Sequence, residues 1–307
     1  MKRGVVRLER VRAEVVDTRR QLLYLRASLI TISGNILLTA VKAVLAWFTG
    51  SSAVFSDAAN SLADTFYSLL MGVGLYVSQQ PADESHPQGH SLFEPMVSLM
   101  IAAAMALAGL AALWQSIQGL LGEKTVSEPG WSTAVLLGAV LIKVVMYLMV
   151  QGIGRKVHSP AIRASARDNL VDIITSVTAL LGVWGSYFIH PLFDPVAGLM
   201  VSLWIFRAVW GIAWENLGYL TGRGAPVELA DKIAAIAAGV PGVDQVHRVI
   251  AEYIGPQLRV DMHINVDGNM TLELAHSIGE RVNERIESLP EVDLVFIHIE
   301  PTEIEKN

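Results

Sequence analysis

Two pairs of oxygen-bearing side chains stand four residues apart within apolar segments of the sequence. Asp168 and Asp172 belong to "RDNLVDIITS", and Asn60 and Asp64 belong to "SDAANSLADTFYS". Side chains at this spacing share one face of a helix. Three carboxylates gathered together would repel one another if ionised, so a divalent cation is the simplest partner for them, with protons as the alternative. Taken alone, Asp168 could simply begin its helix, but the second pair favours a binding site.

The segments around these residues are typical of a membrane protein. The 307 residues are 52% hydrophobic and 17% charged, with a mean hydropathy of +0.44, which is too apolar for an ordinary soluble domain of this length. An acidic side chain near the bilayer centre costs about 2.5 to 3.5 kcal/mol on insertion scales, so it usually faces a polar cavity. Six apolar runs are long enough to cross about 30 Å of hydrocarbon. They are residues 22–49, 53–78, 92–121, 132–153, 162–189 and 195–220.

The placement of basic residues predicts how these six helices are oriented. Lys and Arg occur in the N-terminal segment, in "GRKVHSPAIR" and at Arg223, whereas "TGSS", "LGEKTVSEPG" and "IHPLFDP" contain Lys124 alone. The positive-inside rule therefore places both termini in the cytoplasm, and we expect the cytoplasmic membrane of a prokaryote. The charged opening is unlike a cleaved signal peptide. We expect a cytosolic segment over residues 1–21 and a six-helix transmembrane domain over residues 22–222.

A change in composition after "TGRGAP" predicts a cytosolic C-terminal domain over residues 223–307. Residues 225–307 carry 15 acidic and 6 basic side chains. "VELADKIAAIAAG" and "TLELAHSIGERVNERIESL" have helical periodicity, whereas residues 243–254, "QLRVDMHINV" and "EVDLVFIHIE" are typical of strands. The order helix, strand, strand, helix, strand predicts a small α+β domain, ferredoxin-like, with its helices on one face of the sheet.

The chain resembles the cation diffusion facilitators, a family of divalent-metal/proton antiporters, over essentially its whole length. The resemblance rests on the two four-residue spacings, on "QQPADESHPQGHSLFE", on "FDPVAGLMVSLWIF", and on the acidic tail with "VPGVDQVH" and "VFIHIEP". It implies a transporter, not an enzyme, that exports a divalent cation from the cytoplasm in exchange for protons by alternating access. It also implies a homodimer in the lipid bilayer, with no cofactor besides the transported ion and no nucleic-acid partner.

The family's transport site maps onto Asn60, Asp64, Asp168 and Asp172, and their types predict the cation. Zinc-transporting members commonly have a histidine in one or both pairs, because imidazole suits tetrahedral zinc. Both pairs lack histidine here, and the chain has no cysteine. An all-oxygen set suits a harder cation such as Mn²⁺, and this combination resembles the manganese branch. We expect Mn²⁺, with Fe²⁺, Zn²⁺, Co²⁺ or Cd²⁺ as alternatives. Further possible cavity or interface groups are Asn35, Lys42, Asp57 and Lys143.

Two further groups match places where related transporters bind metal. In the cytosolic loop they are Asp83, His86 and His90, although the His-Pro and Gly-His steps there could serve only as turns. In the tail the resemblance implies a regulatory metal between two subunits. The residues at the matching tail positions are His247, His263, His276, His298 and Glu300. The two-residue period places the last two on one strand face, although an exposed histidine is usually just a solvated side chain.

Two functions of other classes are alternatives. An intramembrane aspartyl protease also uses two membrane aspartates that share a proton. Its usual Gly-x-Gly-Asp signature is missing, since Arg167 precedes Asp168 and Ala63 precedes Asp64. A non-transporting sensor would bind the ion in its tail and signal to a partner. Metal flux into liposomes discriminates between a sensor and a transporter.

Overall fold

The computed structural model describes residues 18–49, 52–86, 88–122, 131–157 and 159–302. Most of the predicted N-terminal segment, residues 1–17, lies outside this part. The chain divides into two compact units, residues 1–217 and residues 218–307.

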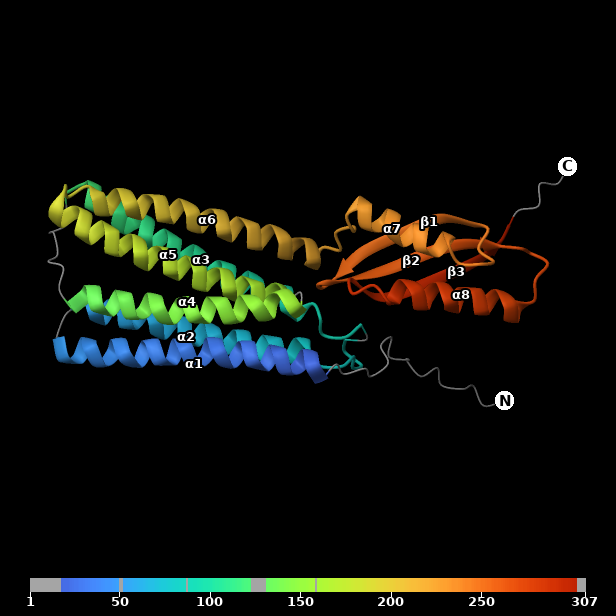
Figure 1. Cartoon of the computed structure of the whole chain (residues 1–307), viewed down its shortest axis with the longest axis horizontal. Helices are drawn as coiled ribbons and strands as arrows, with labels where there is room; N and C mark the ends of the chain where they lie inside the picture. Colours follow the sequence, from blue (N-terminus) through green and yellow to red (C-terminus); the bar gives the residue numbers. More distant parts are fainter. Residues whose placement is uncertain (1–17, 50–51, 87, 123–130, 158, 303–307) are drawn as a thin grey trace. The chain divides into compact units, whose positions relative to one another are not determined.

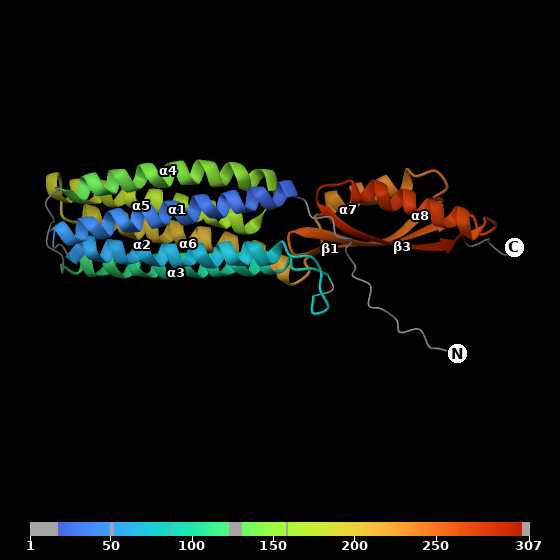
Figure 2. The same ribbon diagram turned by 90° about the horizontal axis from the view of Figure 1, so that it is seen from below.

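The first unit is a helical bundle. Its long helices run side by side along a common direction (Figures 1 and 2). Within the described ranges they are α1 (Thr18–Thr49), α2 (Ser52–Ser78), α3 (Phe93–Leu120), α4 (Trp131–Val157), α5 (Pro160–Phe188) and α6 (Phe193–Leu220). Ser159 caps α5, because its side chain accepts a hydrogen bond from the backbone N–H of Ile162 and Pro160 follows as the first helical residue, both of which favour a helix start.

Four of the described helices are long and apolar enough to cross a membrane. These segments are Thr18–Val44, Phe93–Leu120, Leu137–Val157 and Pro195–Leu220. The helices α2 and α5 are not among these four segments; they hold the acidic pairs, and α5 also contains Arg163 and Arg167. Helices that line a polar site need not be uniformly apolar. Six spans therefore remain a prediction, whereas four rest on length and composition.

The bundle has an apolar outside and polar groups inside. Large apolar side chains such as Leu107, Leu203 and Trp210 are exposed, at 62%, 68% and 70%. Asn35 and Lys143 are instead buried. Lipid is as apolar as leucine, so hydrogen bonds and close packing hold such helices together.

A buried glutamate joins three helices of the bundle. Glu94, in the first turn of α3, is only 1% exposed. Its Oε2 accepts a hydrogen bond of 3.0 Å from the Tyr24 hydroxyl of α1. Its Oε1 accepts one from the hydroxyl of Ser159, the residue that caps α5. A buried carboxylate needs such donors, so the helix ends are fixed relative to one another.

The second unit is a three-stranded sheet with two helices. Its elements are α7 (Val227–Ala238), β1 (Gln245–Ile254), β2 (Gln257–Val266), α8 (Leu272–Glu287) and β3 (Val292–Pro301). The strand order is β1-β2-β3, with β1 antiparallel and β3 parallel to β2. Both helices cover the same face of the sheet (Figure 2). The predicted element order and helix placement are confirmed.

Strict alternation along β2 separates a core face from a polar face. Leu258, Val260, Met262 and Ile264 are buried and pack with the apolar sides of α7 and α8. The intervening positions, which include His263, face the other way and are half-buried. The face without helices therefore carries the polar side chains of this unit.

Candidate metal centres

The predicted transport site is a cavity lined by residues of α1, α2, α3 and α5. Asp64 comes from α2, and Asp168 and Asp172 come from α5, one turn apart. All three line a cavity of about 260 Å³. Thr31, Ser68 and Ser165 add hydroxyl groups to the lining. Asn60 lies on α2 one turn before Asp64, but its side chain is outside the described part of the chain.

A lysine from α4 reaches these carboxylates. The Nζ atom of Lys143 lies 2.6 Å from Oδ2 of Asp172 and 3.7 Å from Oδ2 of Asp64. It also donates a hydrogen bond of 3.0 Å to Oδ1 of Asn35, on α1. The Lys143 side chain is 7% exposed. The structure therefore brings together Asp64, Asp168 and Asp172 as predicted and adds a buried ammonium group to them.

Asn35 is itself held in place. Its Nδ2 donates 2.5 Å to the hydroxyl of Ser68, which in turn donates 2.7 Å to the backbone carbonyl of Asp64. The amide oxygen is then left to accept from Lys143. From the sequence, Asn35 and Lys143 are only possible cavity or interface groups. The signal that would have ranked them higher is a charged residue inside an apolar span, which usually has a functional partner.

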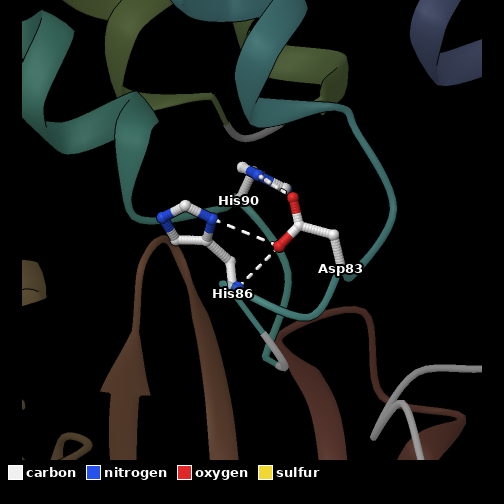
Figure 3. A group of neighbouring side chains, drawn as sticks. All are labelled: Asp83, His86 and His90. Carbon is white, nitrogen blue, oxygen red and sulfur yellow. Dashed lines mark hydrogen bonds and ion pairs between the residues drawn. The ribbon is translucent and has the colours of Figure 1, made fainter.

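The loop between α2 and α3 brings its three predicted ligands together (Figure 3). Asp83, His86 and His90 each offer one ligand atom within 4.8 Å of the others. Oδ1 of Asp83 lies 3.4 Å from Nδ1 of His86, and Oδ2 lies 3.5 Å from Nε2 of His90. The Asp83 and His86 side chains are exposed and His90 is buried.

The hydrogen bonds around the loop group fix which atoms face its centre. Nδ1 of His90 lies 3.1 Å from the carbonyl oxygen of Pro81. A carbonyl oxygen only accepts, so Nδ1 carries a proton, and in the neutral form of the imidazole Nε2 presents its lone pair to Asp83. The backbone N–H of His86 donates 2.6 Å to Oδ1 of Asp83 and is the main reason that the pKa of Asp83 is lowered. An ionised carboxylate facing an imidazole lone pair is an arrangement that a cation completes.

The tail gathers a second set of ligands on the open face of its sheet. His247 of β1, His263 of β2 and Glu300 of β3 have ligand atoms within 4.8 Å of one another. Nδ1 of His263 lies 2.9 Å from Oε1 of Glu300, and Nε2 of His247 lies 3.4 Å from Oε2. Nε2 of His298 lies 3.4 Å from Oε1 of the same glutamate. Glu300 is therefore the common partner of three histidines.

Strand register explains why these residues meet. His263 pairs with His298 across β2 and β3. The β1 and β2 register shifts between Val246 and Arg248, so His247 occupies an irregularity in the ladder. Such a bulge re-aims the side chain of the extra residue. Nδ1 of His247 lies 2.8 Å from Oδ1 of Asn265, which leaves Nε2 for Glu300.

One predicted tail ligand does not join this set. His276 is exposed on α8, and α8 covers the opposite face of the sheet (Figure 2). The remaining four predicted tail residues do come together. The hydrogen bond from His263 is the main reason that the pKa of Glu300 is lowered, so this carboxylate stays ionised to lower pH.

Comparison with known proteins identifies the class to which this fold and site belong. Residues 28–221 match the family model described as the cation efflux transmembrane domain, and residues 225–302 match the cytoplasmic domain of cation efflux proteins. The chain belongs to the cation efflux family, so the resemblance to cation diffusion facilitators is confirmed. It is an integral membrane transporter of divalent metal ions and not an enzyme, which removes the protease alternative.

Similar proteins come from different organisms. An uncharacterized transporter, MJ0449 of Methanocaldococcus jannaschii, is 29% identical over 89% of this chain and 96% of its own length. The manganese efflux system protein MneS of Bacillus subtilis is 25% identical over 90% of this chain and 95% of its own. A solved structure of a MamM CTD variant is 30% identical and covers 25% of this chain and 94% of its own, with a TM-score of 0.24.

Proposed function

We propose that this protein exports Mn²⁺ from the cytoplasm in exchange for protons. The observation that carries the proposal is one cavity lined by Asp64, Asp168 and Asp172, with hydroxyl groups beside them and no imidazole among the described lining residues. Mn²⁺ prefers carboxylate, carbonyl and water oxygens, whereas histidine ligands favour zinc. MneS, whose name records manganese efflux, supports the same ion.

A proton is the natural ion to exchange for the metal at such a site. Metal ligands must be deprotonated to bind, so loading an ion releases protons from the carboxylates. Reprotonation on the other side of the membrane weakens the site and releases the ion. The carboxylates belong to α2 and α5, so a small relative movement of these helices exposes the same site to either side, as alternating access requires.

The loop and tail groups serve regulation in this proposal. Both groups contain imidazoles whose ligand atoms lie close enough together to bind one cation. Neither group lines the cavity of the transport site. The second unit matches a cytoplasmic domain of the family. We place both termini in the cytoplasm and expect two copies of the chain to associate through these tails, with a metal ion bound between or beside them.

The experiment that tests the function measures flux. Purified protein in liposomes with an imposed pH gradient should take up Mn²⁺ with a higher kcat/KM than Zn²⁺. Asp64→Asn and Asp172→Asn each remove a ligand charge, so both should lower Mn²⁺ flux at least a hundredfold and stop metal-driven proton movement. Asp231→Asn, an exposed position on α7, is the matched control and should transport normally.

Three results would overturn parts of this proposal. Intact Zn²⁺ flux without Mn²⁺ flux would reverse the selectivity. Near-normal flux in Asp172→Asn would show that this carboxylate is not an essential ligand. A folded protein that binds Mn²⁺ but moves no cation would favour the sensor alternative.

A further inference from the structure

The transport site contains a positive charge that belongs to the protein itself. Lys143 Nζ lies 2.6 Å from Asp172 and 3.7 Å from Asp64, within reach of the carboxylates that would bind the transported ion. Its side chain is 7% exposed, so these carboxylates supply the charge compensation that a buried ammonium needs. In the structure an ammonium group thus binds where a transported cation would take its ligands.

Hydrogen bonds to other residues hold Lys143 in this position. Asn35 Oδ1 accepts a hydrogen bond of 3.0 Å from Nζ, and Asn35 is in turn bonded to Ser68. Fixing a lysine side chain costs rotamer entropy, and the hydrogen bond to Asn35 helps to offset that cost. Nζ therefore has one neutral partner on α1 in addition to the carboxylates on α2 and α5. This neutral acceptor remains available when the carboxylates turn to a metal ion.

Charge balance gives this arrangement a function. Asp64, Asp168 and Asp172 together carry three potential negative charges, and a divalent ion neutralises two of them. In an apolar surrounding the remaining charge would make the loaded site bind its ion too tightly, because Coulomb interactions are several times stronger there than in water. One ammonium beside three carboxylates lets a loaded divalent site reach neutrality.

We infer that Lys143 is a tethered counter-cation of the transport site. Its ammonium group pairs with Asp172 when no metal is bound. It releases Asp172 to the entering divalent ion while keeping its hydrogen bond to Asn35, and it pairs with Asp172 again as the ion leaves. Competition between the ammonium and the metal lowers the affinity and speeds release. This inference rests on the proposed function and adds to it a residue on α4, outside the α2 and α5 pairs.

The test separates affinity from turnover in the full chain. Lys143→Met removes the charge and keeps an unbranched side chain. In proteoliposomes its KM for Mn²⁺ should fall roughly tenfold or more, since one opposing charge at this distance changes binding by at least that factor. The kcat should fall as well, because release becomes slow. Lys156→Met, an exposed lysine in the last turn of the same helix, is the matched control and should keep both constants.

Two further variants keep the inference testable if Lys143→Met does not fold. Lys143→Gln shortens the side chain and should show the same fall in KM. Asn35→Ala keeps the lysine but removes its neutral acceptor, so Nζ should hold Asp172 more persistently and KM should rise. A KM within threefold of wild type in a folded Lys143→Met or Lys143→Gln protein would overturn the inference.

The outcomes also separate this inference from the proposed function. If wild-type Mn²⁺ flux is present and is lost in Asp172→Asn, the transport site stands whatever Lys143→Met shows. If Asp172→Asn transports normally, Asp172 is not an essential ligand, and the contact between Lys143 and Asp172 is then structural.

Discussion

Each candidate metal group has a carboxylate that already has a partner of its own. Asp172 is paired with Lys143, Asp83 accepts the N–H of His86, and Glu300 accepts from His263. The lowered pKa values of Asp83 and Glu300 keep these carboxylates ionised and ready as ligands. The interactions of these two ionised carboxylates stabilise the folded protein above the ordinary carboxyl pKa. This stabilisation is lost as the pH falls through the lowered folded-state pKa.

The ligand type at Asp168 should control which ion is moved. Asp168→His introduces the imidazole that zinc prefers, so the ratio of Zn²⁺ to Mn²⁺ flux should rise about tenfold or more. Flux of both ions into liposomes at matched concentrations measures this ratio. Asp168→Asn, which removes the charge without adding an imidazole, is the control. The same ratio in both variants would show that selectivity lies outside this position.

At the scale of the elements, small residues set how closely the helices of the bundle approach. A Cβ atom added to Gly109 of α3 would lie 3.0 Å from Ile205 Cγ2 and 3.4 Å from Phe206 Cε1, both of α6. Gly211 of α6 has no such neighbour within 4 Å. Glycines let neighbouring groups pack close to the backbone of a membrane helix, and Gly109 makes this room for Ile205 of α6.

This packing predicts different effects for two glycine substitutions. Gly109→Leu overpacks the contact between α3 and α6 and should destabilise the protein by about 1–3 kcal/mol. Gly211→Ala fills open space on a helix and should be neutral or stabilising by up to about 1 kcal/mol. Thermal unfolding in detergent measures both variants, with the folded fraction monitored as the height of the protein's elution peak in size-exclusion chromatography after heating. An equal or greater loss in Gly211→Ala would contradict this account.

At the scale of the whole molecule, the acidic C-terminal unit should respond to metal. Residues 225–307 carry 15 acidic against 6 basic side chains, so two such domains in a dimer repel each other at low salt. A divalent ion on Glu300 and its histidines reduces that repulsion and can bind ligands from both copies. The tails of a dimer should therefore move closer when metal binds.

Spin labels test this movement directly. The chain has no cysteine, so Glu280→Cys on the exposed side of α8 gives one label per copy. The distance between labels should shorten by several ångströms and narrow in distribution when Mn²⁺ or Zn²⁺ is added. Glu300→Ala in the same background removes the common ligand and should abolish the change. An identical distribution with and without metal in the parent would remove the regulatory role and leave transport untouched.

Local sequence patterns suffice to predict a helical membrane protein with a small α+β domain after its helices. Apolar runs, basic loops and alternating tail strands are local patterns, and each follows from hydrophobicity or from the period of a single element. The four-residue spacing of Asp168 and Asp172 also needs only one helix to be read. The identity and order of the tail elements could therefore be predicted, and so could the acidic residues that line the cavity.

Which distant side chains meet depends on how the helices and strands pack together. Lys143 joins Asp64 and Asp172 only because α4 packs beside α5 and α1. His247 reaches Glu300 through a register shift that no single strand reveals. His276 has the same residue type as the other predicted tail ligands, yet its helix lies on the opposite face of the sheet. Packing between elements depends on contacts far apart in sequence, and no local periodicity records it.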